Sequence, residues 1–283
     1  MTRKNHRGLI VWLLLWVALW VSACGGGRNI KRMTLKDRIK YAVELFKDGK
    51  YLSAKTQFQI IVLNNPGSSI VDMAQFYLAE SYFNLKEYIT AAAEYEKLLN
   101  LYPRSPYVDD AQYKLALSYF KLSPKADLDQ KYTYKAIDEF QRFLEEYPES
   151  EYVSEVTKML QKCREKLAKK EFISGNLYRK MGYHRSAIIV FDEILSRYYD
   201  TSYAEDAYFW KAYCLTKIGK YAEARDNIQA LLSRYPKSKY RERAIKLADT
   251  IDIELKKAAN ETTNENHDGT PTNHQSPRGG RED

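Results

Sequence analysis

A pattern that recurs five times along the chain constrains its fold more than any other feature of the sequence. It is anchored by a column of four prolines and one tyrosine: Pro66, Pro103, Pro148, Tyr199 and Pro236. Twelve positions before each of them stands an alanine: Ala54, Ala91, Ala136, Ala187 and Ala224. Eight positions before stands a large apolar residue: Phe58, Tyr95, Phe140, Phe191 and Ile228. Such self-similarity indicates an array of like units rather than one irregular domain.

Two more columns complete each unit. A hydroxyl residue stands two positions after the reference column: Ser68, Ser105, Ser150, Thr201 and Ser238. A small apolar residue stands eight positions after it: Ala74, Ala111, Val156, Ala207 and Ala244. Since the alanine and the large residue lie four apart, they share one helix face, and the proline ends that helix. We expect the hydroxyl residue to cap the next helix, so that each unit is a pair of antiparallel helices.

The repeat resembles the tetratricopeptide repeat (TPR), whose usual period is about 34 residues. Here the reference positions are 37, 45, 51 and 37 residues apart. We assign the second spacing to an insertion near Leu122 to Tyr132 and the third to a long helix, roughly Val153 to Ala168. One unit cannot bury its apolar face alone, so the units stack and leave a concave inner surface. The sequence therefore predicts an all-α fold, a TPR-like α-solenoid of five helix-turn-helix repeats.

Helix signals also mark the two ends of the array. Thr34 to Lys47 has the pattern of a helix capped by Thr34, and Arg241 to Lys257 that of a last helix. We place repeats 1–3 in residues 34–168 and repeats 4–5 in residues 169–257. Residues 258–283 are polar and hold almost no apolar side chains, so we expect a disordered tail.

Residues 1–23 have the pattern of a secretory signal peptide. Arg3, Lys4 and Arg7 precede an uninterrupted apolar run of 13 residues, Leu9 to Val21. A transmembrane helix needs about 20 apolar residues, whereas the apolar region of a signal peptide needs about 7–15, followed by small residues. We therefore interpret the run as a signal peptide that is removed.

The stretch Val21-Ser22-Ala23-Cys24 resembles the bacterial lipobox, in which an apolar and two small residues precede a cysteine. Cys24 would receive an S-diacylglycerol group, become the first residue after cleavage, and be N-acylated. Residues 24–33 would then be the lipidated cysteine and its tether. Each buried CH₂ contributes about 0.8 kcal/mol, so three acyl chains anchor a protein stably. The alternative is an ordinary signal peptide or short anchor with an incidental cysteine.

The remaining sequence has no motif of catalysis, metal binding or cofactor binding. We interpret Cys163 and Cys214 as small buried apolar residues, with a disulfide as the alternative in an oxidising compartment. His184 stands where other repeats carry tyrosine, so we interpret it as a packing residue. The net charge of +8 is spread along the chain without dense basic blocks, which argues against nucleic-acid binding. We expect no enzyme and no cofactor.

Tyrosine is abundant, with 24 residues, and one subset follows the repeat. These tyrosines stand four positions after the reference column: Tyr107, Tyr152, Tyr203 and Tyr240. We expect them to pack between repeats, while some other tyrosines line the inner groove, where aromatic rings hold extended peptides.

These features together resemble the BamD (ComL-type) family, lipoproteins of the outer-membrane β-barrel assembly complex. The resemblance covers about Leu35 to Ile251. It is most specific between Tyr147 and Ile188, in "YPESEYVSEVTKMLQKCREKLAKKEFISGNLYRKMGYHRSAI". There a helix ending in "LAKKEF" leads into the next repeat through "LYRKMGYHRSA". The insertion in the third repeat and the polar tail depart from the commonest members.

The resemblance implies five TPRs in two halves. Repeats 1–3 would form a pocket for segments of unfolded outer-membrane proteins, and repeats 4–5 would dock on a BamA-like β-barrel protein. Other lipoproteins of the complex would be partners. The chain would be lipid-anchored at the outer membrane, facing the periplasm; Gly25 after the cysteine favours that membrane by analogy with proteobacterial sorting.

Two other functions stay open at this point. The first is a different envelope TPR lipoprotein, such as a pilus-assembly pilot or a coordinator of cell-wall synthesis or division. The second is an enzyme acting on peptidoglycan, which would need a catalytic arrangement around His184.

Overall fold

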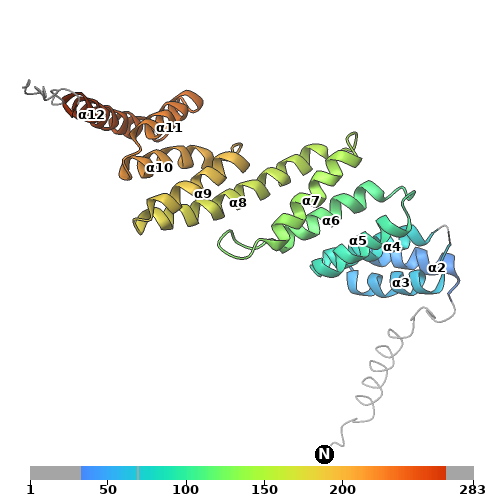
Figure 1. Cartoon of the computed structure of the whole chain (residues 1–283). Coiled ribbons are helices and arrows are strands. Elements are labelled where there is room, and N and C mark those ends of the chain that lie inside the picture. The colour runs from blue at the N-terminus through green and yellow to red at the C-terminus, as the bar shows by residue number, and fades with distance from the viewer. Residues whose placement is uncertain (1–32, 69, 266–283) are drawn as a thin grey trace, which may run out of the picture. The chain divides into compact units, whose positions relative to one another are not determined.

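The computed structural model describes residues 33–68 and 70–265. Every regular element of this part of the chain is an α-helix, and it contains no strand (Figure 1). The expected signal peptide (1–23) and Cys24 lie outside the described residues. The helices are, in chain order, α2 (Leu35–Lys47), α3 (Tyr51–Asn64), α4 (Val71–Asn84), α5 (Tyr88–Leu101), α6 (Val108–Leu122), α7 (Lys131–Glu146), α8 (Val153–Lys180), α9 (His184–Arg197), α10 (Tyr203–Lys217), α11 (Tyr221–Arg234) and α12 (Arg241–Glu265).

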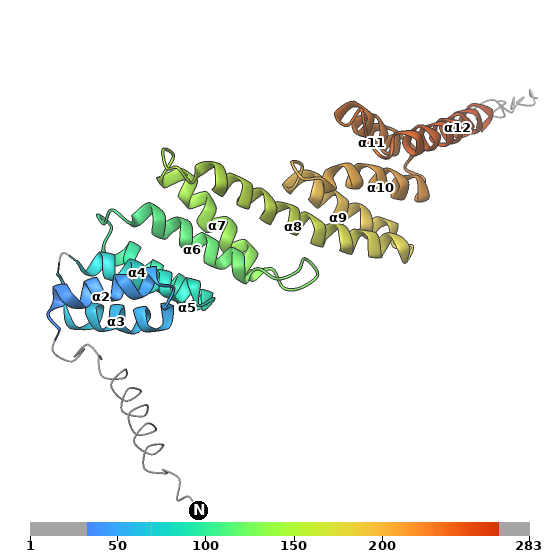
Figure 2. The same cartoon turned by 180° about the vertical axis from the view of Figure 1, so that it is seen from behind.

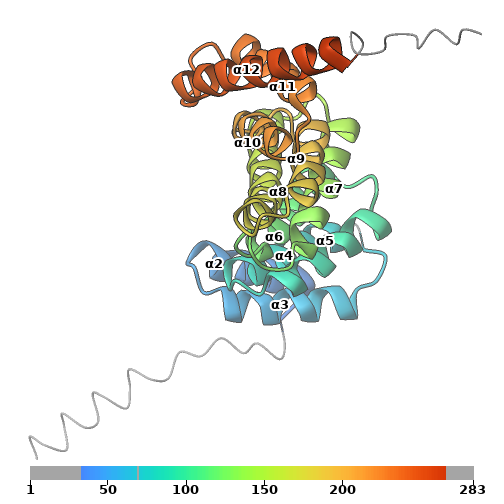
Figure 3. The same cartoon turned by 60° about the vertical axis from the view of Figure 1, so that its left-hand side comes forward.

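The helices form two compact units, one ending at Ala111 and the other beginning at Gln112, within α6. In the first unit α2 packs against α3, and α4 against α5 (Figure 2). In the second unit α7 lies along the first half of α8 and α9 along its second half (Figures 1 and 2). Helix α12 lies beside α11 at the end of this unit (Figure 3). This succession of helix pairs confirms the expected all-α, TPR-like α-solenoid.

The columns of the sequence repeat form the core of both units. The five alanines twelve positions before the reference column are completely buried. The large apolar residues of the next column are at most 2% exposed, and the small residues eight positions after the reference are completely buried. In the second unit Phe191 joins α8, α9 and α10 in one cluster, and Ile228 joins α10, α11 and α12 in another. The periodic positions are thus the contact faces between successive helices.

The expectation that the hydroxyl column caps helices is wrong. In every turn the N–H of the hydroxyl residue donates three positions back, and its C=O accepts from the N–H three positions on. Ser238 makes these bonds with Tyr235 (2.9 Å) and Arg241 (3.1 Å), and its Oγ accepts from the N–H of Tyr240 (3.0 Å). Two consecutive turns are needed because the chain must reverse direction before a helix can restart. Thr34, in contrast, caps α2 as expected, with its Oγ1 accepting from the N–H of Asp37 (3.2 Å).

The tyrosines four positions after the reference column pack between neighbouring helices, as expected. Three of them stack on an aromatic ring of the preceding helix pair, with parallel rings. The pairs and their centroid distances are Tyr107–Phe76 (4.8 Å), Tyr152–Tyr113 (4.5 Å) and Tyr240–Phe209 (4.4 Å). The ring centroid of the fourth, Tyr203, lies 5.5 Å from that of Phe172, and the two rings are tilted relative to each other. These aromatic pairs fill the space between adjoining helices.

Helix α8 is longer than the sequence indicates. The expected helix ends near Ala168, but the observed one has 28 residues and continues to Lys180. No proline interrupts it, and Gly175 is tolerated because it lets α9 approach: a Cβ there would lie 2.8 Å from Phe191 Cε1. Since α8 crosses residue 168 without a break, the grouping of repeats at that point stays a prediction.

Helix α12 also extends past its expected end at Lys257, to Glu265. Alanine and glutamate, which follow Lys257, favour helix. Residues 266–283 lie outside the described residues, so the disordered tail stays a prediction there. Among the described helices, none is both long and apolar enough to cross a membrane.

Candidate binding surface along helix α8

The insertion in the third repeat forms a loop, residues 123–130, between α6 and α7. Gln130 is buried at its end, and its side-chain amide donates to the carbonyls of Lys125 (2.7 Å) and Leu128 (3.0 Å). Its Oε1 accepts from the hydroxyl of Thr133 (2.6 Å). A buried amide bonded on both sides fixes the backbone around it. The loop is therefore held in a shape that can form one wall of a site.

Two lysines of α8 attach this loop to the helix. The Nζ of Lys166 donates to Ser123 Oγ (2.6 Å), and the Nζ of Lys170 donates to the Leu128 carbonyl (3.1 Å). Partial burial lowers the pKa of Lys166. The insertion is thus part of the α8 surface and not a free excursion from the repeat.

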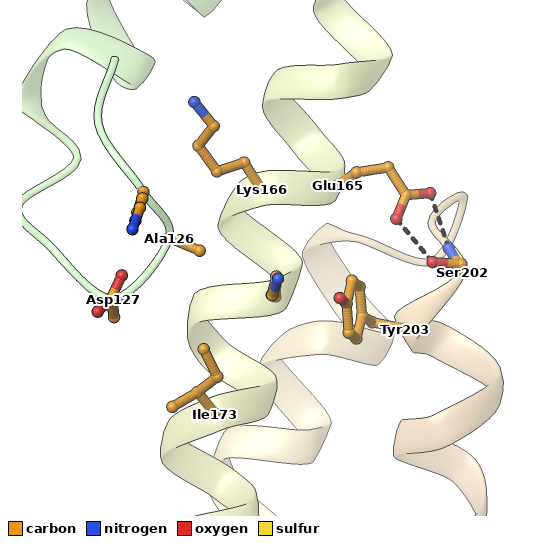
Figure 4. Close-up of a pocket in the computed structure, with 9 residues that line it drawn as sticks. Ala126, Asp127, Glu165, Lys166, Ile173, Ser202 and Tyr203 are labelled. Carbon is orange, nitrogen blue, oxygen red and sulfur yellow. Dashed lines mark hydrogen bonds between the residues drawn. The ribbon is translucent and has the colours of Figure 1, made fainter.

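The turn between α9 and α10 forms the opposite wall. The Glu165 carboxylate accepts from the N–H and the hydroxyl of Ser202, both at 2.8 Å (Figure 4). The Arg164 guanidinium donates to both oxygens of Asp200 (2.6 and 2.8 Å). This hydrogen bonding lowers the pKa of Asp200 and raises that of Arg164. A paired carboxylate–guanidinium contact fixes orientation as well as distance, so the turn is set firmly against α8.

A cavity of about 760 Å³ lies between these two walls. Figure 4 shows Ala126 and Asp127 on one side of α8 and Ser202 and Tyr203 on the other. Its lining consists of Lys125, Ala126, Asp127, Glu165, Lys166, Lys169, Ile173, Ser202 and Tyr203. Three lysines face two acids, and Glu165 is already bonded to Ser202. The cavity therefore has an excess of positive charge.

An exposed apolar stripe continues from this cavity along α8. It consists of Ile173 and Leu177 on α8 and of Met181, which directly follows the helix; these side chains are 43%, 56% and 56% exposed. Residues four apart lie on one face of a helix, so the three side chains form a continuous row. We call this row the α8 stripe. Contiguous exposed apolar side chains beside polar groups are typical of protein interaction sites.

The cavity and the α8 stripe together suit a protein segment that presents apolar side chains, with its polar groups meeting the lysines. A smaller cavity of about 360 Å³ lies in the first unit, beside the turn from Tyr102 to Ser105.

The residues singled out from the sequence do not meet at this surface. Cys24 lies outside the described residues. His184 packs edge-on near Tyr213, with 6.3 Å between the ring centroids, as Tyr88 does near Phe83 (5.3 Å). This contact supports its interpretation as a packing residue.

The two cysteines of the repeats are free and completely buried. Burial raises the pKa of Cys163 to about 12 and that of Cys214 to about 11. Their burial confirms the interpretation as small buried residues, and thiols with raised pKa values are poorly reactive at neutral pH. Within residues 33–68 and 70–265, no cluster of His, Cys, Asp or Glu side chains is arranged to hold a metal ion.

The sequence analysis did not predict the α8 surface. Two features of the sequence are related to it: the long spacing of 45 residues in the third repeat, and the apolar residues at 173, 177 and 181. The first marks the loop that forms a wall. The second has the four-residue spacing of a helix face, but spacing alone does not tell a covered face from an exposed one.

Comparison with known families gives two matches. Residues 32–219 match the YfiO family, whose members are outer membrane lipoproteins. Residues 206–238, which contain α11 and most of α10, match a tetratricopeptide repeat family. No curated protein matches the chain.

Several solved TPR structures resemble the fold. The TPR2AB domain of yeast Sti1 in its pHSP90 complex is 16% identical, with 80% of this chain and 86% of that chain covered and a TM-score of 0.42. A TPR protein of Parabacteroides merdae is 16% identical, with 81% and 76% covered and a TM-score of 0.34. A thermophilic TPR protein of Thermus thermophilus is 17% identical, with 78% and 99% covered and a TM-score of 0.34.

Proposed function

Because the chain belongs to the YfiO family of outer membrane lipoproteins, we propose that it is a scaffold of the outer-membrane β-barrel assembly complex. It aids the folding and insertion of outer-membrane proteins by binding the barrel subunit and unfolded client segments. The family match carries this proposal, since it spans all of α2 to α10. The scaffold acts by holding partners and not by catalysis.

The lipid anchor is part of the proposed mechanism. Cys24 bears the S-diacylglycerol and N-acyl groups, and the tether that follows it holds the repeats at the periplasmic face of the outer membrane. Confinement beside the barrel subunit raises the effective concentration of the two partners, so modest intrinsic affinity suffices. A Cys24→Ala chain should be lost from the outer-membrane fraction, whereas a Cys163→Ala chain should stay in it.

The repeats divide the partners between them in this proposal. Repeats 4–5 dock on a BamA-like β-barrel protein, and other lipoproteins of the complex join there. Client segments bind repeats 1–3, and the cavity and the α8 stripe are a second place of client contact; the stripe lies within residues 169–257, so it is the part of repeats 4–5 that contacts clients and not the barrel protein. The exposed row of Ile173, Leu177 and Met181 supports this role, because unfolded β-barrel segments carry apolar side chains on alternate positions.

A crosslinked pull-down from membranes tests the proposal directly. A tagged copy of the full chain should recover a large β-barrel protein, and depletion of the chain should lower the amounts of outer-membrane proteins. Recovery of pilus or division proteins, with normal β-barrel levels, would favour a different envelope TPR lipoprotein instead.

A matched pair of variants tests the client role of α8. Leu177→Glu places a charge in the α8 stripe, and Ile253→Glu places one on α12 at nearly equal exposure (56% and 55%). We expect Leu177→Glu to reduce crosslinking to client segments several-fold and to leave barrel-subunit recovery unchanged. The Ile253→Glu variant should keep client crosslinking. Equal client crosslinking in both variants would remove the α8 stripe from the mechanism.

A further inference from the structure

Two arginines lie against one tryptophan in the second unit. The Cζ of Arg179, on α8, is 3.8 Å from the ring centroid of Trp210, on α10. The Cζ of Arg243, on α12, is 5.1 Å from the same centroid and 4.6 Å from that of Phe209. Cation–π attraction of this kind holds a guanidinium group in place. We call Arg179, Trp210 and Arg243 the arginine–tryptophan patch.

Both guanidinium groups keep donors for a further partner. Arg179 donates from Nε and Nη2 to the side-chain oxygen of Asn176 (3.1 and 2.8 Å). A guanidinium has about five N–H donors, so roughly three remain on Arg179. Arg243 is exposed, and among the described residues it has no hydrogen bond or ion pair. The patch therefore offers fixed, planar donors that the second unit itself does not use.

The acids near the patch are already engaged. Asp206 accepts from the hydroxyl of Tyr240 (2.5 Å) and pairs with Lys239 (2.7 Å). Glu205 accepts from the hydroxyl of Ser238 (2.5 Å). The positive charge of the patch is therefore not neutralised by these carboxylates.

We propose that the arginine–tryptophan patch binds an acidic, extended segment of a partner protein. Charge complementarity selects this occupant, because a carboxylate accepts two parallel hydrogen bonds from a guanidinium fork. Trp and Arg are also the residues most enriched at binding hot spots. A segment that crosses the patch meets Arg179 on α8, Trp210 on α10 and Arg243 on α12 in turn, since α10 contacts both other helices.

This inference does not depend on the role in barrel assembly, because it uses only the local chemistry of the second unit. A failed pull-down of the barrel subunit would leave it standing. Conversely, a patch that binds no acidic segment would leave the scaffold role untouched.

A peptide-binding measurement on the full chain in detergent tests the patch. The probe is fluorescein-labelled hexaglutamate, with hexalysine as the control of opposite charge, followed by fluorescence anisotropy at low salt. We expect hexaglutamate to bind and hexalysine not to. Arg179→Gln and Arg243→Gln should each weaken binding about tenfold, as expected for loss of a charge-assisted pair. Arg185→Gln removes the same charge from an exposed position on α9 and should change binding by less than about twofold.

Three results would overturn the proposal. Equal weakening by Arg185→Gln would mean that binding follows net charge and not the patch. Preferential binding of phosphatidylglycerol vesicles, lost in the Arg243→Gln chain, would make an anionic lipid the occupant. Hexaglutamate binding that appears only after residues 266–283 are removed would make the chain's own tail the occupant.

A second readout covers the case in which Arg179→Gln fails to fold. The other tryptophans are Trp12, Trp16 and Trp20, and each can be replaced by Phe in the full chain. Trp210 is then the single tryptophan of the chain, and the Cζ atoms of Arg179 and Arg243 lie 3.8 and 5.1 Å from its ring centroid. Hexaglutamate should shift its emission in the otherwise unchanged protein. Binding without any shift in emission would place the peptide elsewhere and overturn the proposal.

Discussion

Helices α4 and α8 are covered to very different extents. Nine of the 14 residues of α4 are buried, whereas five of the 28 residues of α8 are. In α4 even polar side chains are buried. The Glu80 carboxylate accepts a hydrogen bond from the hydroxyl of Tyr95, and Gln75 Nε2 donates to Glu94 Oε2 of α5 (2.7 Å). Such enclosed bonds add stability as long as they are made.

Several polar side chains of α8 bond to loops. Arg164 and Glu165 hold the turn before α10, and Lys166 holds the 123–130 loop. The α8 stripe meanwhile stays uncovered. The side chains of α4 thus stabilise the core of their unit, whereas those of α8 shape an exposed surface.

The largest expected effect comes from one substitution made in both helices. Leu78 of α4 is 4% exposed and Leu177 of α8 is 56% exposed. Leu78→Ala should lower the free energy of unfolding by about 2–5 kcal/mol through lost burial and a cavity. Leu177→Ala should change it by less than about 0.5 kcal/mol. Urea denaturation followed by circular dichroism measures both, and similar losses would mean that the α8 stripe is covered in the folded chain.

The second prediction compares the loss of a buried tyrosine hydroxyl with the loss of an exposed one. Tyr95→Phe removes a hydrogen-bond donor from the buried carboxylate of Glu80 and should cost about 1–3 kcal/mol. Tyr178→Phe, on the exposed part of α8, should cost almost nothing. The same denaturation curves give both values. A Tyr178→Phe chain as unstable as the Tyr95→Phe chain would contradict the distinction.

Tyr95 also predicts how stability changes with pH. Burial, together with Glu80, raises its pKa well above the ordinary value of about 10. Because the unfolded chain ionises first, this contribution is present below about pH 10 and is lost as pH rises further. Unfolding free energies measured between neutral and alkaline pH should fall less steeply for Tyr95→Phe than for the original chain.

The burial of α4 could be predicted from the sequence, whereas the exposed surface of α8 could not. Ala74 lies in a repeat column, and period and residue size suffice to place it in a core. The exposure of Leu177 depends on which elements fail to cover α8, and no local pattern records that. The cavity wall depends on Lys166 reaching Ser123, 43 positions away. The contact of Arg179 with Trp210 is likewise set by the packing of α8 on α10.

The turns that end the two helices give the third prediction. Each is closed by a residue with positive φ: Lys86 after α4 (64°) and Gly182 after α8 (82°). A side chain is strained in this conformation, and glycine is not. Lys86→Gly should therefore stabilise the first unit by about 0.5–1 kcal/mol.

The converse change at Gly182 checks the same reasoning. A Cβ there meets nothing within 4 Å, so Gly182→Ala tests backbone strain alone. It should destabilise the second unit by about 1 kcal/mol. Thermal unfolding of both variants gives the sign of each change. A stabilised Gly182→Ala chain would show that the gain in chain stiffness outweighs the strain in this turn.

The smallest effect concerns the ion pair at the wall of the α8 cavity. Arg164 and Asp200 are partly exposed, so Asp200→Asn should cost at most about 1 kcal/mol at neutral pH. The contribution of this ion pair to the free energy of unfolding is recognised by its dependence on pH. Hydrogen bonding to Arg164 lowers the pKa of Asp200, so the contribution is present above about pH 4 and is lost as pH falls through the folded pKa. Stability of the Asp200→Asn chain should therefore fall less than that of the original chain as pH drops below about 4.

A matched control separates this pair from acids in general. Asp192, on α9, pairs with Lys211 (2.6 Å), and its side chain is 50% exposed against 34% for Asp200. Asp192→Asn should leave the acid dependence of stability almost unchanged, because a more exposed single contact is better screened by water. If both substitutions flatten the acid dependence equally, the wall pair has no special role in setting the turn. If only Asp200→Asn does, the Arg164–Asp200 pair stabilises the folded second unit in a way that a more exposed ion pair does not.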